Sequence, residues 1–173
     1  MELGRLDAKI NLKDSAGFSA RSFRDALGCF ATGVVVVTTH PEGYKPIGLT
    51  VNSFASVSLD PPLVLWSLDR GADTHAPFLA SDHFAINVLR ADQEALSVRL
   101  STRGSHGLHD DEYETWETGA PILMDTLAQF DCEIQERIDG GDHVIFLGRV
   151  KRMASREGEP LLFARGKYRE FKS

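Results

Sequence analysis

The sequence is poor in cysteine and in long apolar runs. Its 173 residues include only two cysteines, Cys29 and Cys132, which lie far apart and form no Cys-x-x-Cys pair. A disulfide framework or a thiolate zinc site is therefore not expected. No apolar run approaches the ~20 residues of a membrane helix, and the N-terminal segment lacks the apolar stretch of a signal peptide. These absences predict a soluble cytoplasmic protein with no membrane partner.

The sequence also lacks a concentration of positive charge. Lysine and arginine together number 19 against 25 aspartates and glutamates, which gives a formal net charge of −6. Proteins that bind nucleic acids usually present a basic face to the phosphates, and no Lys/Arg cluster occurs here. We expect any anionic ligand to be held locally, by a few cations, hydroxyl groups and backbone N–H groups.

Three common catalytic motifs are missing as well. The sequence contains no GxGxxG that opens a helix after a strand, no GxxxxGK[ST] and no GxSxG. Their absence argues against a conventional dinucleotide-binding domain, a P-loop enzyme and an α/β-hydrolase.

Length and composition indicate one domain with a sizeable core, because 42% of the residues are hydrophobic. Residues 1–20 are polar and show no periodicity, which predicts a loose N-terminal arm or a segment that embraces a second subunit. The domain itself is expected to span residues 21–173.

Helical spacing is limited to short segments. Phe23, Ala26, Leu27 and Phe30 follow one another at helical intervals, so we expect a helix that begins at Ser22 and ends before Gly33. Two further short helices are expected over residues 74–80 and 92–100.

Strand signals cover most of the remaining chain. Runs of β-branched residues and alternation of apolar with polar residues predict strands at 34–39, 63–68, 84–89, 128–134, 144–150 and 161–168. Turns are expected at 40–43, 139–142 and 157–160, and the polar segment 101–121 is expected to be a long loop. Many strands joined by hairpins, with few helices, predict a mainly β fold: an antiparallel barrel with helical caps.

The segment 48–58 concentrates small residues, hydroxyl groups and one amide side chain. Such a surface allows close approach of a flat ligand, and Thr50 and Ser53 are able to donate hydrogen bonds to an anion. A strand with one polar face, followed by a turn, is the alternative interpretation of the same residues.

Four blocks of sequence resemble the flavin reductase family. GLTVNSFASVSLDPPLVLWSL, FAINVL, GDHVIFLGRV and PLLFARGKY occur in the order that is typical of these NAD(P)H:flavin oxidoreductases, between Phe23 and Tyr168. The resemblance implies an antiparallel split β-barrel that binds FMN, with FAD as a possible substitute, and a homodimer with the flavin near the subunit interface. NADH or NADPH would be the hydride donor.

The resemblance also implies a set of site residues. The expected cofactor-binding residues are Thr50, Val51, Asn52, Ser53, Ser67, Leu68, Arg70, Thr74, Arg103 and Tyr168. The phosphate-binding turn of the family often carries serines before its threonine, whereas Ala72 and Asp73 precede Thr74 here. Asp73 would place a carboxylate close to a phosphate, so we expect Arg70 to offset this charge and Arg103 to reach the phosphates.

His143 is the expected catalytic residue. The sequence Gly141-Asp142-His143 resembles the GDH turn of the family, whose histidine lies beside the face of the flavin that binds the nicotinamide. We expect His143 to orient NAD(P)H, and no obligatory proton transfer is expected of it. Tyr168 and Phe171 would line the nicotinamide stack, and ordinary core or interface aromatics are the alternative interpretation.

The predicted function is a flavin reductase that supplies reduced flavin to a partner monooxygenase, such as a 4-hydroxyphenylacetate 3-monooxygenase. One alternative keeps the chemistry but changes the acceptor: a corrinoid reductase acting on cob(II)yrinic acid a,c-diamide in cobalamin biosynthesis. Another is a non-catalytic flavin- or haem-binding split barrel. The ligand-type residues His106, His109, Asp110 and Asp111 raise the possibility of a metal hydrolase, but Gly104 and Gly107 disfavour a rigid helix, so no metal site is predicted.

Overall fold

Strands are the main regular secondary structure of the chain. The computed structural model describes residues 17–170, so most of the predicted arm 1–20 and the predicted ligand contact Phe171 lie outside the described residues. In chain order the elements are α1 (Ala20–Leu27), β1 (Thr32–Gly33), β2 (Val35–Thr39), β3 (Ile47–Val51), β4 (Ala55–Leu59), β5 (Pro62–Asp69), α2 (His75–Ala80), β6 (His83–Val88), η1 (Ala91–Gln93), α3 (Glu94–Ser101), β7 (Tyr113–Thr115), β8 (Pro121–Leu123), β9 (Ala128–Gly140), β10 (His143–Ser155), β11 (Leu162–Ala164) and β12 (Lys167–Arg169).

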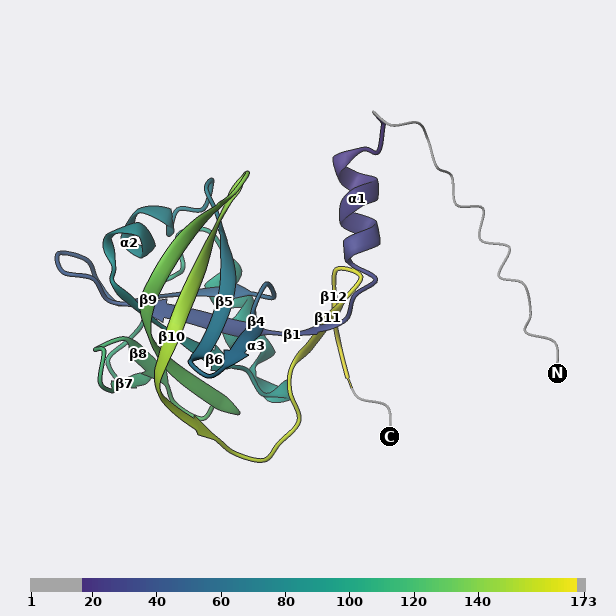
Figure 1. Ribbon diagram of the computed structural model, residues 1–173. Helices are drawn as coiled ribbons and strands as arrows, with labels where there is room; N and C mark the ends of the chain where they lie inside the picture. Colours follow the sequence, from purple (N-terminus) through teal and green to yellow (C-terminus); the bar gives the residue numbers. More distant parts are fainter. Residues whose placement is uncertain (1–16, 171–173) are drawn as a thin grey trace.

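The main sheet has seven antiparallel strands in the order β3-β2-β6-β9-β10-β5-β4. Its two edge strands, β3 and β4, follow each other in the chain and are joined only by residues 52–54. The link from residue 51 to residue 55 spans at most about 14 Å. The sheet must therefore roll around a common interior until its edges approach each other, as Figure 1 shows. We call residues 52–54 the seam. The predicted mainly β, antiparallel fold is confirmed.

Aromatic side chains fill the interior of the rolled sheet. Trp66 stacks on Phe146 with 4.8 Å between ring centroids and meets Phe78 of α2 edge-on at 4.9 Å. Along β5 the buried residues alternate with partly exposed ones, so Trp66 and Leu68 point inward while Ser67 and Asp69 point outward. Because of this alternation, a site built on Ser67 lies on the outer surface of the barrel.

A small three-stranded sheet, β1-β11-β12, lies beside the barrel, and α1 projects next to it (Figure 1). The helix begins and ends earlier than predicted. Ser19 is its N-cap, because the Ser19 hydroxyl accepts a hydrogen bond from the backbone N–H of Ser22, and Gly28 ends it. Phe30, expected on the helix, lies beyond it and is 78% exposed.

The segment 101–121 is more ordered than the predicted loop. It contains β7, which pairs with β8 and places Tyr113 opposite Leu123. The polar residues around β7 hide this short strand in the sequence pattern. Upstream of it, the expected helix 92–100 is present as η1 followed by α3.

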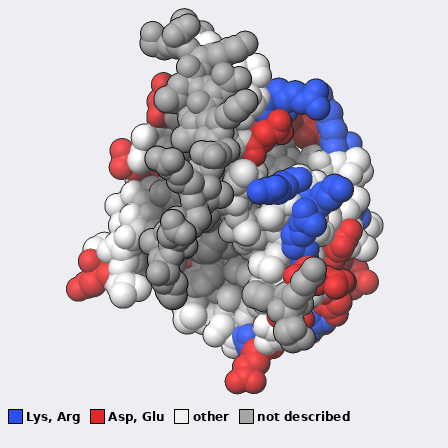
Figure 2. All heavy atoms as spheres, turned by 90° about the vertical axis from the view of Figure 1, so that its right-hand side faces the viewer, with Lys and Arg blue, Asp and Glu red and all other residues white. Residues whose placement is uncertain are grey.

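The surface carries charges of both signs. On the face that includes the α1 side of the molecule, lysines and arginines gather in one region, and acidic side chains flank them (Figure 2). None of the helices among residues 17–170 is long and apolar enough to cross a membrane.

Candidate functional site

A hollow of about 350 Å³ lies on the outside of the barrel at the seam. It is built where the end of β3, the end of β5, the turn before α2 and the start of β10 meet. Its lining residues are Leu49, Thr50, Val51, Asn52, Ser53, Ser67, Asp69, Ala72 and His143. Six of these nine residues were expected from the sequence. The nine come from segments up to 94 positions apart.

Ser53 and Ser67 meet through a paired hydrogen bond. The Ser53 hydroxyl accepts from the backbone N–H of Ser67 at 3.0 Å and donates to the Ser67 carbonyl at 3.1 Å. This arrangement fastens the seam to β5. The Ser53 hydroxyl is consequently engaged with the backbone, in contrast to the anion donor expected from the sequence.

Thr50 is also engaged within the fold. Its hydroxyl donates to the carbonyl of Ser97 in α3 at 2.8 Å, and the Ser97 hydroxyl lies 2.8 Å from the Tyr168 hydroxyl. Thr50 and Tyr168 line a second hollow of about 220 Å³, which shares Asn52 with the first. The exposed Asn52 stands between the two hollows, and its amide makes no hydrogen bond within the described residues.

His143 lies at the rim of the first hollow, at the start of β10. Its Nδ1 is 2.7 Å from Oδ1 of Asp142, and this hydrogen bond holds the pKa of Asp142 below its usual range. The contact leaves Nε2 of the imidazole available to a ligand. With 41% of its side chain exposed, His143 is accessible from solvent.

Arg70 braces the turn that carries His143. Its Nε donates to the Gly141 carbonyl at 3.0 Å, and its Nη2 donates to Asp139 at 2.8 Å. The hydrogen bond and the charge of the guanidinium lower the pKa of Asp139. Arg70 is not among the residues that line the hollow, and its two hydrogen bonds support the turn.

The remaining predicted residues lie apart from the hollow. Leu68 is fully buried in the core, so only its backbone is available to a ligand. Thr74 caps α2 and is 2% exposed, and its hydroxyl has no hydrogen-bond partner among residues 17–170. Arg103 is exposed, and no ion pair to it occurs within the described part of the chain. Asp73 turns to the segment 101–109, where its carboxylate accepts a hydrogen bond from Gly104 N–H at 2.7 Å.

Two residues of the hollow escaped the sequence reasoning: Leu49 and Asp69. The period of two along β5 would have placed Asp69 on the same outer face as Ser67. The same reasoning along β3 pairs Leu49 with Val51. Ala72 was expected in the phosphate-binding turn but was not named as a cofactor-binding residue, and it lines the hollow.

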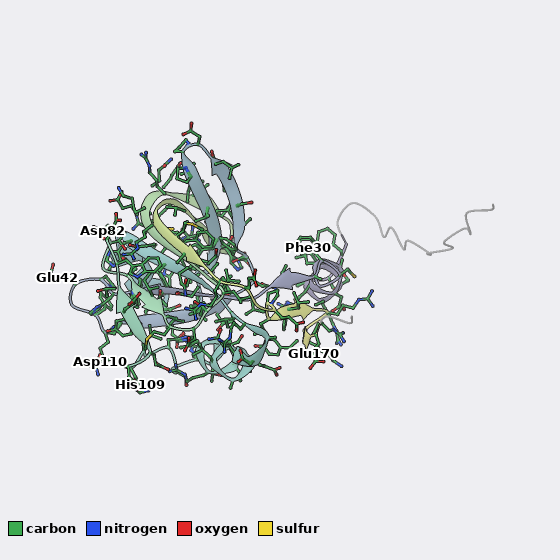
Figure 3. The ribbon with its side chains drawn as sticks, turned by 90° about the horizontal axis from the view of Figure 1, so that it is seen from below. Phe30, Glu42, Asp82, His109, Asp110 and Glu170 are labelled. Atoms are coloured by element: carbon green, nitrogen blue, oxygen red, sulfur yellow. The ribbon has the colours of Figure 1, made fainter. Side chains whose placement is uncertain are left out.

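The histidines of the segment 106–111 do not act together. His106 is buried, whereas His109 and Asp110 lie at the periphery of the molecule (Figure 3). Among the described residues, no three His, Cys, Asp or Glu side chains are grouped so that they could hold a metal ion.

Comparisons with known proteins agree with one another. Residues 27–172 match a family model described as "Flavin reductase like domain". FMN reductase (NADH) SmoA of Agrobacterium fabrum is 52% identical, covering 90% of this chain and 88% of that protein. The reductase subunit HsaB of a flavin-dependent monooxygenase of Rhodococcus jostii is 39% identical, over 86% of this chain and 76% of that protein. Among solved structures, the chain superposes on the NADH:FAD oxidoreductase SgcE6 of Streptomyces globisporus in complex with NAD and FAD fragments. The TM-score is 0.80 at 37% identity, over 88% of this chain and 92% of that protein.

Proposed function

Because this chain belongs to the flavin reductase-like domain family, we propose that it is an NAD(P)H-dependent flavin reductase that transfers hydride from NADH or NADPH to bound FMN or FAD. The observation that carries the proposal is the convergence of distant segments. The seam, the end of β5 and the GDH turn line one hollow, and Tyr168 lines the hollow beside it.

The residues present fit a flavin. Leu49, Val51 and Ala72 give the hollow an apolar wall suited to a flat ring, and the free amide of Asn52 suits the polar edge of such a ring. The buried hydroxyl of Thr74 has no partner among the described residues, and a phosphate oxygen near this turn would satisfy it.

A bound flavin supplies the hydride acceptor, so the work of the chain is to bind and orient. With a flavin bound, the seam would hold the edge of its ring near Asn52, where backbone N–H groups would be suited to stabilise negative charge. His143, whose imidazole is held by Asp142, would offer Nε2 to the nicotinamide amide. Tyr168, whose hydroxyl is hydrogen-bonded to that of Ser97, lines the neighbouring hollow. Holding donor and acceptor at reacting distance is the main requirement of hydride transfer.

The partner of the reaction is proposed from the relatives. The reductase subunit HsaB belongs to a flavin-dependent monooxygenase, and we propose that this chain likewise passes reduced flavin to a monooxygenase component. We propose a cytoplasmic location on the same ground, since the reaction needs NADH.

We further propose a homodimer. Phe23, Leu27 and Phe30 are at least half exposed on or just after α1, which has no buried residue of its own. A second copy would cover this apolar surface, of which Phe30 is labelled beside α1 in Figure 3. Light scattering on the intact protein tests the dimer, and Leu27→Glu is expected to shift the mass to that of one chain.

The activity is tested by following NADH absorbance with FMN, FAD or no added flavin. We expect NADH to be consumed far faster with the protein and flavin together than with flavin alone. Flavin binding without a rate above that of free flavin would contradict the proposal and favour a binding protein. A parallel assay with cob(II)yrinic acid a,c-diamide would show whether a corrinoid is reduced instead.

A further inference from the structure

His106 is a buried histidine that the proposed reaction does not use. Its residue is 7% exposed. Its Nδ1 lies 3.0 Å from the carbonyl oxygen of Leu100 at the end of α3, and its Nε2 lies 2.9 Å from Oδ1 of Asp73. The ring therefore joins α3 to the turn that precedes α2.

Both groups that face the His106 ring can only accept hydrogen bonds. A carbonyl oxygen has no proton to give, and an ionised carboxylate has none either. Burial opposes ionisation of Asp73, but hydrogen bonds from Gly104 and His106 and the charge of His106 outweigh it and leave the pKa of Asp73 lowered. Both ring nitrogens of His106 therefore face acceptors, an arrangement that a ring with a proton on each nitrogen satisfies, and the ring pairs with Asp73.

Charged groups of α3 and of the segment 102–112 lie around this pair, and β3 adds a backbone contact. Arg99 of α3 donates to the Gly107 carbonyl, beside His106, at 2.9 Å and pairs with Glu112. Arg103 directly precedes Gly104, whose N–H is bonded to the second carboxylate oxygen of Asp73. On the β3 side the backbone N–H of Gly48 donates to the His106 carbonyl. The pair thus fixes the segment that carries Arg103 against the turn of Asp73.

The position of Asp73 gives the pair a consequence for ligand binding. Asp73 follows Ala72, which lines the hollow at the seam. A free carboxylate at this turn would repel a phosphate group, whereas a carboxylate neutralised by His106 would not. Among the described side chains in contact with Asp73, His106 is the one that is able to carry a compensating positive charge.

We propose that His106 is a positioning residue for the phosphate of the bound flavin: it neutralises Asp73, turns its carboxylate toward Gly104 and holds Arg103 beside the phosphate-binding turn. This inference rests on the proposed flavin site. His106 is needed because position 73 carries a carboxylate. An uncharged side chain at position 73 would not require this neutralisation.

The test compares FMN with riboflavin, which has the same ring but no phosphate. Dissociation constants are measured by quenching of flavin fluorescence for the unaltered protein, His106→Gln and the double variant Asp73→Asn/His106→Gln. We expect His106→Gln to weaken FMN binding about tenfold and riboflavin binding by less than about twofold, because only the phosphate meets the unpaired carboxylate. The double variant, which removes the charge of Asp73, should restore FMN binding to within about threefold.

Other results would overturn the inference. If His106→Gln weakens FMN and riboflavin binding equally, His106 has only a structural role. If it changes neither dissociation constant, His106 does not act on the phosphate. If the unaltered protein binds neither flavin, the proposed function itself fails. Should His106→Gln not fold by circular dichroism, Arg103→Ala serves instead, since Arg103 is exposed. That variant should weaken FMN several-fold and leave riboflavin unchanged, and equal effects on both would also contradict the inference.

Discussion

His143 lies directly opposite Asp69 in the antiparallel ladder between β10 and β5. Both residues line the hollow at the seam, one from each strand. The ladder fixes this pairing through the backbone, so the position of His143 does not depend on its own side-chain contacts. The imidazole is therefore placed by the sheet and oriented by Asp142.

Replacement of His143 by alanine should impair the use of NADH more than flavin binding. We expect kcat/KM for NADH to fall by about ten- to a hundredfold, because the nicotinamide loses a group that orients it. The dissociation constant for FMN should change by less than about threefold. His109→Ala is the matched control, since His109 lies at the periphery of the molecule (Figure 3). Equal losses for both variants would contradict the assignment.

Removal of the Ser53 hydroxyl should destabilise the fold. In Ser53→Ala the N–H and carbonyl of Ser67 both lose their partner, so the free energy of unfolding should fall by about 1–3 kcal/mol. Urea denaturation measures the change. Ser56→Ala, on the exposed strand β4, should leave the midpoint unaltered, and a similar loss in both variants would argue against the bridge.

Gly148 should not tolerate a methyl group. A Cβ at this position would lie 2.8 Å from Cε1 of the buried Phe84 and closer still to Cζ of the same ring. We expect Gly148→Ala to reduce the free energy of unfolding by about 1–3 kcal/mol, because the ring must move within a packed core. Gly33→Ala is the control, since no atom lies within 4 Å of its added Cβ. A stable Gly148→Ala protein would indicate that the core adapts more freely.

Acid should weaken the fold through its aspartates. Hydrogen bonds from His143, His83 and Arg70 lower the pKa values of Asp142, Asp82 and Asp139. A lowered pKa in the folded state adds stability above the unfolded pKa of about 4, and this stability disappears as pH falls through the folded value. Urea midpoints should therefore decrease below about pH 4. Asp142→Asn should make this decrease shallower, and an unchanged slope would contradict the role of that pair.

The sequence predicted the central strands well because their residues are buried on a regular pattern. The run of valines that forms β2 and the alternation along the first half of β9 are examples. The outer halves of β9 and β10 extend to Gly140 and Ser155, beyond the predicted ends. These two strand ends lie at opposite ends of the hairpin and both are exposed, so the apolar pattern that marks a strand is absent.

The grouping of the candidate site residues was more predictable than the hydrogen bonds among them. Thr50, Ser53, Ser67 and His143 do line one hollow. The sequence could not show that the hydroxyls of Thr50 and Ser53 bond to backbone groups. The carbonyls of their partners, Ser97 and Ser67, approach them only after folding. The contact between Asp73 and His106, 33 positions apart, is of the same kind.

The seam has a consequence for how such a protein can change over time. Residues 52–54 connect the two edge strands yet take part in none of the ladder pairings of the main sheet. Within the seam, Ser53 is fastened to Ser67 and Phe54 packs against the core, whereas Asn52 is exposed and lines the hollow. Selection for a new flavin or a new electron acceptor can therefore act on position 52 with little loss of foldability.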